Sequence, residues 1–210
     1  MNDTDPKRHS QRHSERRTAT RDLYLAAVTI GERKPFDGRI TLAPYDPDWP
    51  EEFERQAHRI REALSDRVLL LEHVGSTSVP GLSAKPVIDI VLSVSNSADE
   101  AAYIPQLEGQ GFVLRIREPG WYEHRLVKTP HARGNLHVFS AGCEEIDRML
   151  MFRDWLREHE DERRLYENVK RELAARTWRH VQHYADAKSE VVEQILSRAS
   201  SKDSSRLTSA

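Results

Sequence analysis

The chain has 210 residues, of which 38% are hydrophobic and 31% charged, and its formal net charge is −2. This length suits one domain with a sizeable core rather than two. The slightly negative charge argues against bulk attraction to nucleic acid or a membrane as the main function. Cys143 is the only cysteine, which excludes an internal disulfide and a thiolate-based zinc site.

The longest apolar runs, residues 68–71 and 87–94, are too short to span a bilayer. No positively charged start is followed by an apolar signal core. With a single cysteine, these features predict a soluble protein of the reducing cytoplasm.

The two ends of the chain are strongly polar. Residues 1–20 are rich in arginine, histidine and serine, and almost none of their side chains are apolar. Such a segment buries too little surface to offset its ordering entropy, so we expect a disordered basic arm. A solvated arm is favoured over one that binds nucleic acid or a partner. Residues 200–210 predict a similar tail, which leaves a single domain over residues 21–199.

Between these ends the apolar pattern alternates between strand and helix periods. The first predicted strand, residues 40–43, leads into a proline-rich turn over residues 44–50. Asp48 is then expected to cap a helix. The apolar face of that helix comprises Phe53, Ala57, Ile60 and Leu64.

Five more strands are predicted at residues 68–74, 87–94, 112–116, 122–128 and 135–140, with a helix over residues 97–110. The strand at 87–94 is strongly apolar and is expected inside the sheet. From Glu144 onward the pattern is helical. Its three apolar stripes are Ile146, Met149, Leu150 and Leu156; Leu165, Val169 and Leu173; and Tyr184, Ala187, Val191, Ile195 and Leu196. The predicted fold is therefore α/β (α+β): a mixed sheet flanked by helices, with a helical C-terminal third.

A hydroxyl-rich turn after residues 68–74 predicts a phosphate-binding loop. Gly75 lets the backbone approach a phosphate closely, and exposed amides with the Ser76 and Thr77 hydroxyls can donate to its oxygens. Asp89, near the start of the next strand, can hold a Mg²⁺ that bridges those phosphates. A plain turn is the structural alternative. A carboxylate at the start of a buried strand is costly without a cation or donors, which favours the functional interpretation.

Other polar residues are candidates for the same site. Lys85 follows the loop and can neutralise phosphate charge. His137 points opposite to its apolar neighbours on a predicted strand, where it can be a ligand or base, or a solvent-facing histidine. Glu72 and His73 face opposite ways, so one of them should border the site.

A basic sheet face is predicted from Arg125 and Lys128, with Arg115 and Arg117 one strand earlier. It can receive an anionic substrate, although such faces are usually only solvated. Lys188, on the last predicted helix, can reach the substrate or lie on a solvated face.

Aromatic and histidine pairs are also present. Tyr45 and Trp49 can stack on a base, but aromatic residues beside a helix start more often anchor the helix to the core. His180 and His183 have no accompanying glutamate motif or cysteine, so they do not predict a zinc site.

Several motifs, in this order, resemble the GrpB family. They are YDPDWP (45–50), HVGSTSVPGL (73–82), AKPVIDI (84–90), LHV (136–138), FRD (152–154) and YADAK (184–188). The resemblance covers roughly residues 40–198. It implies the fold of the nucleotidyltransferase superfamily and kinship with the C-terminal extension of some dephospho-CoA kinases.

The superfamily motif is Gly-Ser followed on the next strand by acid–apolar–acid. By resemblance, Gly75 and Ser76 bind phosphates, Asp89 binds metal, and His137 takes the place of a later acid. Val91 stands where the second acid is expected. The implied ligand is a nucleoside triphosphate with Mg²⁺, and the implied reaction is nucleotidyl transfer to a small hydroxylated acceptor. The alternative is a non-catalytic sensing or accessory module, and Val91 is the residue that separates the two hypotheses.

Overall fold

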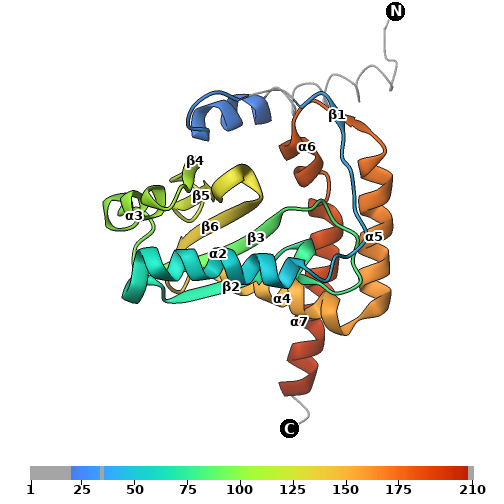
Figure 1. The fold of residues 1–210 in the computed structure, drawn as a ribbon. Helices are drawn as coiled ribbons and strands as arrows, with labels where there is room; N and C mark the ends of the chain where they lie inside the picture. Colours follow the sequence, from blue (N-terminus) through green and yellow to red (C-terminus); the bar gives the residue numbers. More distant parts are fainter. Residues whose placement is uncertain (1–19, 34–35, 208–210) are drawn as a thin grey trace, which may run out of the picture.

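The computed structural model describes residues 20–33 and 36–207 (Figure 1). The helices are residues 20–28, α2 (Trp49–Leu64), α3 (Ile104–Gly109), α4 (Glu144–Glu158), α5 (Glu160–Ala174), α6 (Val181–Asp186) and α7 (Ser189–Leu207). The strands are β1 (Gly38–Arg39), β2 (Leu70–Val74), β3 (Ile88–Val94), β4 (Val113–Glu118), β5 (His124–Lys128), β6 (Gly134–Ser140) and β7 (Thr177–Trp178). No helix among the described residues is long and apolar enough to cross a membrane.

The predicted mixed sheet is confirmed. Its strand order is β2-β3-β6-β5-β4, with β3 and β6 parallel and the other neighbours antiparallel. In the parallel pair Asp89 lies beside Asn135, and Val91 beside His137. Because side chains alternate along a strand, these four residues share one face of the sheet.

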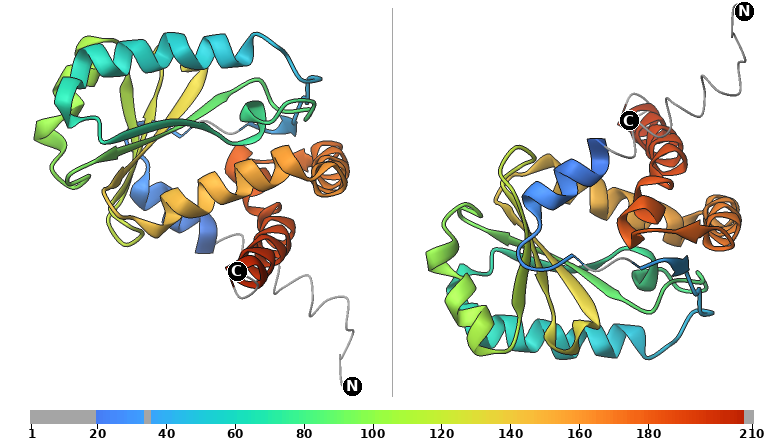
Figure 2. Two further views of the ribbon diagram at one scale, coloured as in Figure 1. Left: turned by 90° about the horizontal axis from the view of Figure 1, so that it is seen from below. Right: turned by 90° about the horizontal axis from the view of Figure 1, so that it is seen from above.

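The opposite face packs against α2 and α3 and forms the largest apolar core. The predicted apolar face of α2 is buried there, and Ile90, Leu92 and Leu136 meet it from the sheet. Figure 2 shows α2 on one side of the sheet, with residues 20–28 and the C-terminal helices on the other.

On the Asp89 face, α4 covers only part of the sheet. Val74, Val91 and Phe139 pack there with Ile146 of α4 in a separate apolar cluster. Beyond this cluster, the strand ends at Asp89 and Asn135 are left open to a pocket. The fold therefore places polar strand residues where α4 does not cover the sheet.

Residues 40–43, which were predicted to form a strand, are not a strand in the structure. Gly38 and Arg39 form β1, which pairs with β7 in a separate two-stranded sheet, while Ala43 makes only an isolated bridge to Ala84. Ile40 packs with Leu173 and Tyr184 instead of joining the main sheet. The prediction of a strand at residues 40–43 is therefore wrong, and Ile40, the buried residue of this run, packs against helices.

The predicted helix at 97–110 is shorter, because Pro105 has no N–H to continue a helix from earlier residues. Residues 100–102 form a 3-10 turn, and α3 begins at Ile104 with the proline in its first turn. The strand predicted from residue 122 begins at His124, since Tyr122 and Glu123 have positive φ values of 53° and 50°. Such values interrupt an extended strand.

The capping role predicted for Asp48 is wrong. Asp48 stands at the N-cap of α2, but its side chain makes no capping bond. Asp46 Oδ1 instead accepts a 3.0 Å bond from the Asp48 backbone N–H, which forms the turn that leads into the helix.

The C-terminal third is helical as predicted, with three differences. Thr177–Trp178 forms β7, Leu165 is exposed rather than buried, and the last predicted stripe is divided between α6 and α7, with Ala187 exposed between them. Helix α7 also continues through residues 200–207, which were predicted to be a tail, because extending an existing helix adds a hydrogen bond for each residue fixed. Residues 1–19 of the predicted arm lie outside the described residues, and residue 20 begins a helix.

Candidate functional site

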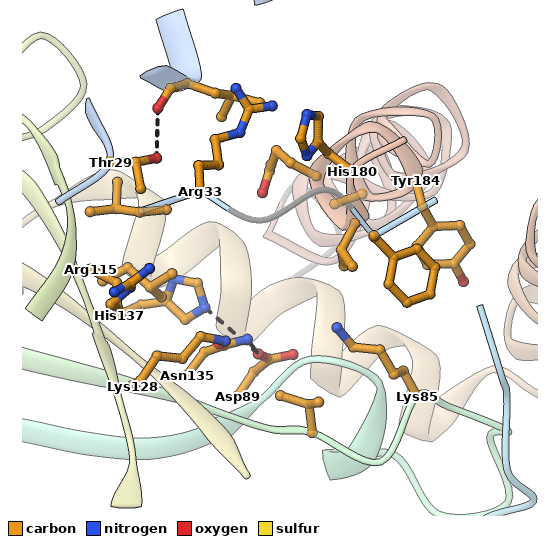
Figure 3. A pocket seen from close by; sticks show the side chains of 18 of the residues that line it. Thr29, Arg33, Lys85, Asp89, Arg115, Lys128, Asn135, His137, His180 and Tyr184 are labelled. Carbon is orange, nitrogen blue, oxygen red and sulfur yellow. Dashed lines mark hydrogen bonds and ion pairs between the residues drawn. The ribbon is translucent and has the colours of Figure 1, made fainter. Parts of the chain in front are cut away.

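A pocket of about 510 Å³ lies between the open end of the Asp89 face, the segment that begins with residues 20–28, and α5 and α6 (Figure 3). Its charged lining is strongly basic. The lysine and arginine side chains are Arg33, Lys85, Arg115, Lys128, Lys170 and Lys188, and the carboxylates are Glu32 and Asp89. Six cationic groups against two anionic ones favour an anionic ligand, in contrast to the net charge of −2 of the whole chain.

Asp89 stands on the floor of this pocket. Asn135 Nδ2 donates a 2.7 Å hydrogen bond to Asp89 Oδ1, and the Asn135 Oδ1 atom in turn accepts from Lys128 Nζ. His137 Nε2 lies 3.8 Å from Asp89 Oδ1. Desolvation opposes ionisation of Asp89, but His137, Asn135 and Lys85 together hold the pKa of its carboxyl below the ordinary value. The carboxylate is therefore ionised at neutral pH.

The position of the Asp89 side chain requires a glycine at residue 75. Its φ is 70° and its ψ −171°, a region that side chains rarely adopt. A Cβ at this position would lie 2.6 Å from Asp89 Oδ2 and 3.0 Å from Asp89 Cβ. The Asp89 carboxylate thus occupies the space beside the Gly75 backbone, where the sequence predicted a phosphate.

Lys170 of α5 reaches the loop that contains Ser76. Its side chain is 1% exposed, and Nζ donates to Ser76 Oγ at 3.1 Å and to the Ser83 carbonyl at 2.6 Å. The ammonium also lies 4.8 Å from the centre of the Tyr166 ring. Among the described residues no carboxylate forms an ion pair with it, and burial lowers the pKa of Lys170 to about 7.

Lys85 completes the basic lining near Asp89. It is half-buried, and desolvation lowers the pKa of its ammonium although the charge of Asp89 opposes this. Within the described part of the chain, Lys85 Nζ makes no hydrogen bond to protein. A partly buried ammonium without a partner is costly, and an anion would offset that cost.

His137 belongs to a hydrogen-bonded chain. Its Nδ1 lies 3.1 Å from Nε2 of His124, whose Nδ1 lies 2.7 Å from Glu118 Oε2. Burial lowers the pKa of His124 to about 4, against the opposing hydrogen bond of Glu118, so this imidazole is neutral at pH 7. A neutral His124 that donates to Glu118 must accept from His137, so Nδ1 of His137 carries a hydrogen and Nε2 faces Asp89 and the pocket. The arrangement leaves Nε2 as the His137 ring nitrogen that is available to a ligand.

Most of the predicted site residues lie around this one pocket. Ser76, Thr77, Lys85, Asp89, Arg115, Lys128, His137 and Lys188 line it. The Thr77 hydroxyl, however, is held internally, because it donates to the Val87 carbonyl at 3.2 Å and lies 3.0 Å from His73 Nε2. Lys188 Nζ lies 4.9 Å from the centre of the Tyr184 ring.

Four other candidates lie away from the pocket. Glu72 faces α4 and pairs with Arg153 at 2.8 Å, while His73 stacks on Phe53 in the core beneath α2. Neither residue borders the site, although one was expected to. Arg125 and Arg117 both pair with Glu100, because β5 and β4 turn them away from Lys128.

The aromatic pair has a structural role, and the histidine pair contacts Asp22, with His180 also lining the pocket. Trp49 is buried and packs edge-to-face with Tyr45 at 5.4 Å, so the two residues anchor α2. His180 and His183 lie 3.9 and 3.0 Å from Asp22 Oδ1 through Nε2.

Sequence reasoning missed Lys170, Asn135 and the pocket residues from the segment 20–36. The composition held one signal for Lys170: lysine is much rarer than arginine in this chain, with 7 lysines among its 32 lysine and arginine residues. Of the five lysines that the structure describes, four line the pocket, and the fifth is Lys202 of α7.

The donor atoms decide which metal arrangement fits. The described residues contain no group of three or more His, Cys, Asp or Glu side chains that could hold a metal ion. Val91 is fully buried in the apolar cluster under α4, so the position expected for a second acid is part of the core. A two-metal site does not fit these residues. A single Mg²⁺ that takes most of its ligands from phosphates and water needs only one carboxylate, and Asp89 meets that requirement.

Comparisons with known proteins agree with this architecture. The family model described as "GrpB protein" matches residues 39–198. The chain belongs to the GrpB family. A family member described as a conserved protein, GrpB of Enterococcus faecalis, has a crystal structure that covers 75% of this chain and 98% of its own, at 27% identity and a TM-score of 0.64.

Two relatives extend the comparison beyond GrpB-named proteins. A UPF0157 protein of Halalkalibacterium halodurans is 58% identical over 87% of this chain and 93% of its own length. A dephospho-CoA kinase of Mycolicibacterium paratuberculosis is 31% identical over 77% of this chain, and the match spans 46% of that kinase. The predicted relation to the GrpB family and to dephospho-CoA kinases is confirmed.

Proposed function

We propose that the pocket binds a nucleoside triphosphate, or a related phosphorylated ligand, together with one Mg²⁺. The observation that carries this proposal is the convergence of six lysine and arginine side chains on a pocket with two carboxylates. Lys85 and Lys170 would neutralise phosphate oxygens beside Ser76, and Asp89 would hold the Mg²⁺ that accompanies the phosphates. The nucleotidyltransferase superfamily to which the sequence motifs point is compatible with these roles.

The reaction that this arrangement would support is nucleotidyl transfer. The hydroxyl oxygen of a small acceptor forms a bond to the α-phosphorus, the bond from that phosphorus to the bridging oxygen breaks, and pyrophosphate leaves. His137 Nε2 would take the hydroxyl proton, and the contact of its Nδ1 with His124, which Glu118 holds, keeps Nε2 directed into the pocket. Lysines that neutralise the phosphates supply the positioning and charge stabilisation on which such transfers depend.

The second candidate is a binding module without turnover. The burial of Val91 favours it, because the second carboxylate of a two-metal site is replaced by core packing. The similarity to part of a dephospho-CoA kinase also fits an accessory role beside another catalytic domain. Both candidates use the same pocket and the same phosphate contacts.

The Asp89→Asn substitution tests the binding proposal. In Mg²⁺, we expect this variant to bind ATP more weakly by about 1 to 3 kcal/mol, since a charge-assisted contact is lost. In EDTA it should bind ATP at least as tightly as the wild type, because a negative charge is removed from beside the phosphates. Calorimetry measures both affinities.

Asp99→Asn is the matched control, because Asp99 is exposed and does not line the pocket. Equal ATP affinity for wild type and Asp89→Asn, both in Mg²⁺ and in EDTA, would contradict the proposed role of Asp89. Pyrophosphate release in a screen of hydroxylated acceptors separates the two candidates: release supports the transferase, and its absence despite Asp89-dependent binding supports the accessory module.

A further inference from the structure

The wall of the pocket opposite Asp89 is built by a segment outside the family match. The match begins at residue 39, whereas Leu25, Thr29, Arg33 and Phe36 line the pocket from residues 20–36. Figure 3 shows Thr29 and Arg33 across the pocket from Asp89 and Lys85. In this chain, a segment that precedes the family match therefore forms a wall of the site.

Ionic and backbone contacts hold this wall in place. Arg21 makes two hydrogen bonds to Asp186 of α6, at 2.8 and 3.0 Å. Asp22 accepts from Arg33 at 2.8 Å and lies 3.0 Å from His183 Nε2. The segment is also tied to the edge of the sheet, where the Ile30 N–H donates to the carbonyl of Arg115 at 2.8 Å.

The chemistry of this wall differs from that of the floor. Leu25 and Phe36 line the pocket from this segment, whereas Ser76, Lys85 and Asp89 line it from the phosphate loop and the strand that follows. Phe36 also lines the pocket and remains 42% exposed, although its backbone N–H is fixed to the carbonyl of Arg179 at 2.8 Å. An aromatic ring left partly open beside an anion-binding region is suited to stack on a flat ring of a ligand.

We infer that residues 25–33 and Phe36 form the subsite for the organic part of the ligand, and that this part is an aromatic ring such as a nucleobase. The inference rests on the proposed function, because it assigns the phosphates to the lysines beside Asp89. It adds that the segment preceding the family core determines specificity. Inorganic triphosphate, which has the phosphates and no ring, should therefore bind without using this wall.

The test compares ATP with inorganic triphosphate, both with Mg²⁺, for the wild type, Phe36→Ala and Leu23→Ala. Leu23 is the matched control because it belongs to the same segment, is 74% exposed and does not line the pocket. We expect the wild type to bind ATP about tenfold or more tightly than triphosphate. Phe36→Ala should weaken ATP binding about fivefold or more and leave triphosphate binding unchanged, whereas Leu23→Ala should change neither.

The outcomes distinguish this inference from the function on which it rests. If the wild type binds both compounds with one affinity, or if Phe36→Ala leaves ATP binding unchanged, the ring subsite is wrong and the phosphate site stands. An equal loss of both compounds in Phe36→Ala also overturns the inference, because the residue would then act on the phosphates. If the wild type binds neither compound, the proposed function fails and the subsite fails with it.

Discussion

The Gly75→Ala substitution is expected to lower the free energy of unfolding by about 3 kcal/mol or more, from backbone strain and steric overlap together. The backbone conformation of Gly75 alone costs a side-chain residue about 1 to 3 kcal/mol. The new Cβ would also lie 2.6 Å from Asp89 Oδ2, a distance that forces the carboxylate or the loop to move. Urea unfolding measures the change, and calorimetry should show that Mg²⁺-dependent ATP binding is lost as well.

Gly81→Ala is the matched control. Gly81 also has a positive φ, 78°, but no atom lies within 4 Å of a Cβ built there. Its substitution should therefore cost only the strain of the left-handed backbone, about 1 to 2 kcal/mol, and leave ligand binding intact. A loss of stability in Gly75→Ala no larger than in Gly81→Ala would show that the Asp89 carboxylate does not depend on this glycine.

The sheet and the core of the site were predictable because they follow from local patterns. Alternation along a strand was sufficient to place His137 opposite Leu136, and the apolar run around Asp89 was sufficient to bury that strand. The Gly-Ser turn then fixed which end of the strand carries the loop. These features depend on residues close in sequence, so a single sequence carries them.

The missed residues depend on contacts between distant segments. Lys170 follows Val169 on an amphipathic helix, and only the docking of α5 against the loop turns its ammonium towards Ser76. The bond between His124 and His137 requires the register of β5 on β6, which no local pattern specifies. The prediction for Glu72 failed for the same reason. Alternation along the strand predicts which face of the sheet Glu72 lies on, but Arg153 of α4 covers that face and pairs with Glu72, which keeps Glu72 out of the pocket.

Val91 connects the sequence departure to the architecture. In the sequence, Val91 occupies the position where the superfamily motif has its second acid. In the structure, Val91 packs with Val74, Phe139 and Ile146 of α4. A carboxylate there would be buried among apolar side chains at a large cost. The position of α4 is therefore compatible with a site that has one carboxylate on its floor. Four lysines and two arginines supply the cationic charge of the pocket.

Lys170 is expected to make ligand affinity depend on pH. Its ammonium has a pKa of about 7 in the free protein, because it is buried without a carboxylate partner. A bound phosphate would favour the charged form and raise that pKa, so binding takes up a proton above pH 7. The affinity for ATP should consequently fall as pH rises above 7, by up to about tenfold for each pH unit, until the pKa of the complex is reached.

The Lys170→Met substitution separates this effect from the titration of the ATP phosphates. At pH 6.5 it should weaken ATP binding by about 1.5 to 3 kcal/mol, the scale of a hydrogen bond to a charged group. Lys202→Met is the control, since Lys202 lies on α7 outside the pocket.

Between pH 7 and 9, the difference in affinity between wild type and Lys170→Met should shrink, because the wild-type lysine loses its proton in the same range. Calorimetry in buffers of different ionisation enthalpy should detect proton uptake at pH 8 in the wild type and in Lys202→Met, and less of it in Lys170→Met. A difference that stays constant from pH 6.5 to 9 would mean that Lys170 remains charged throughout and that its burial does not control binding.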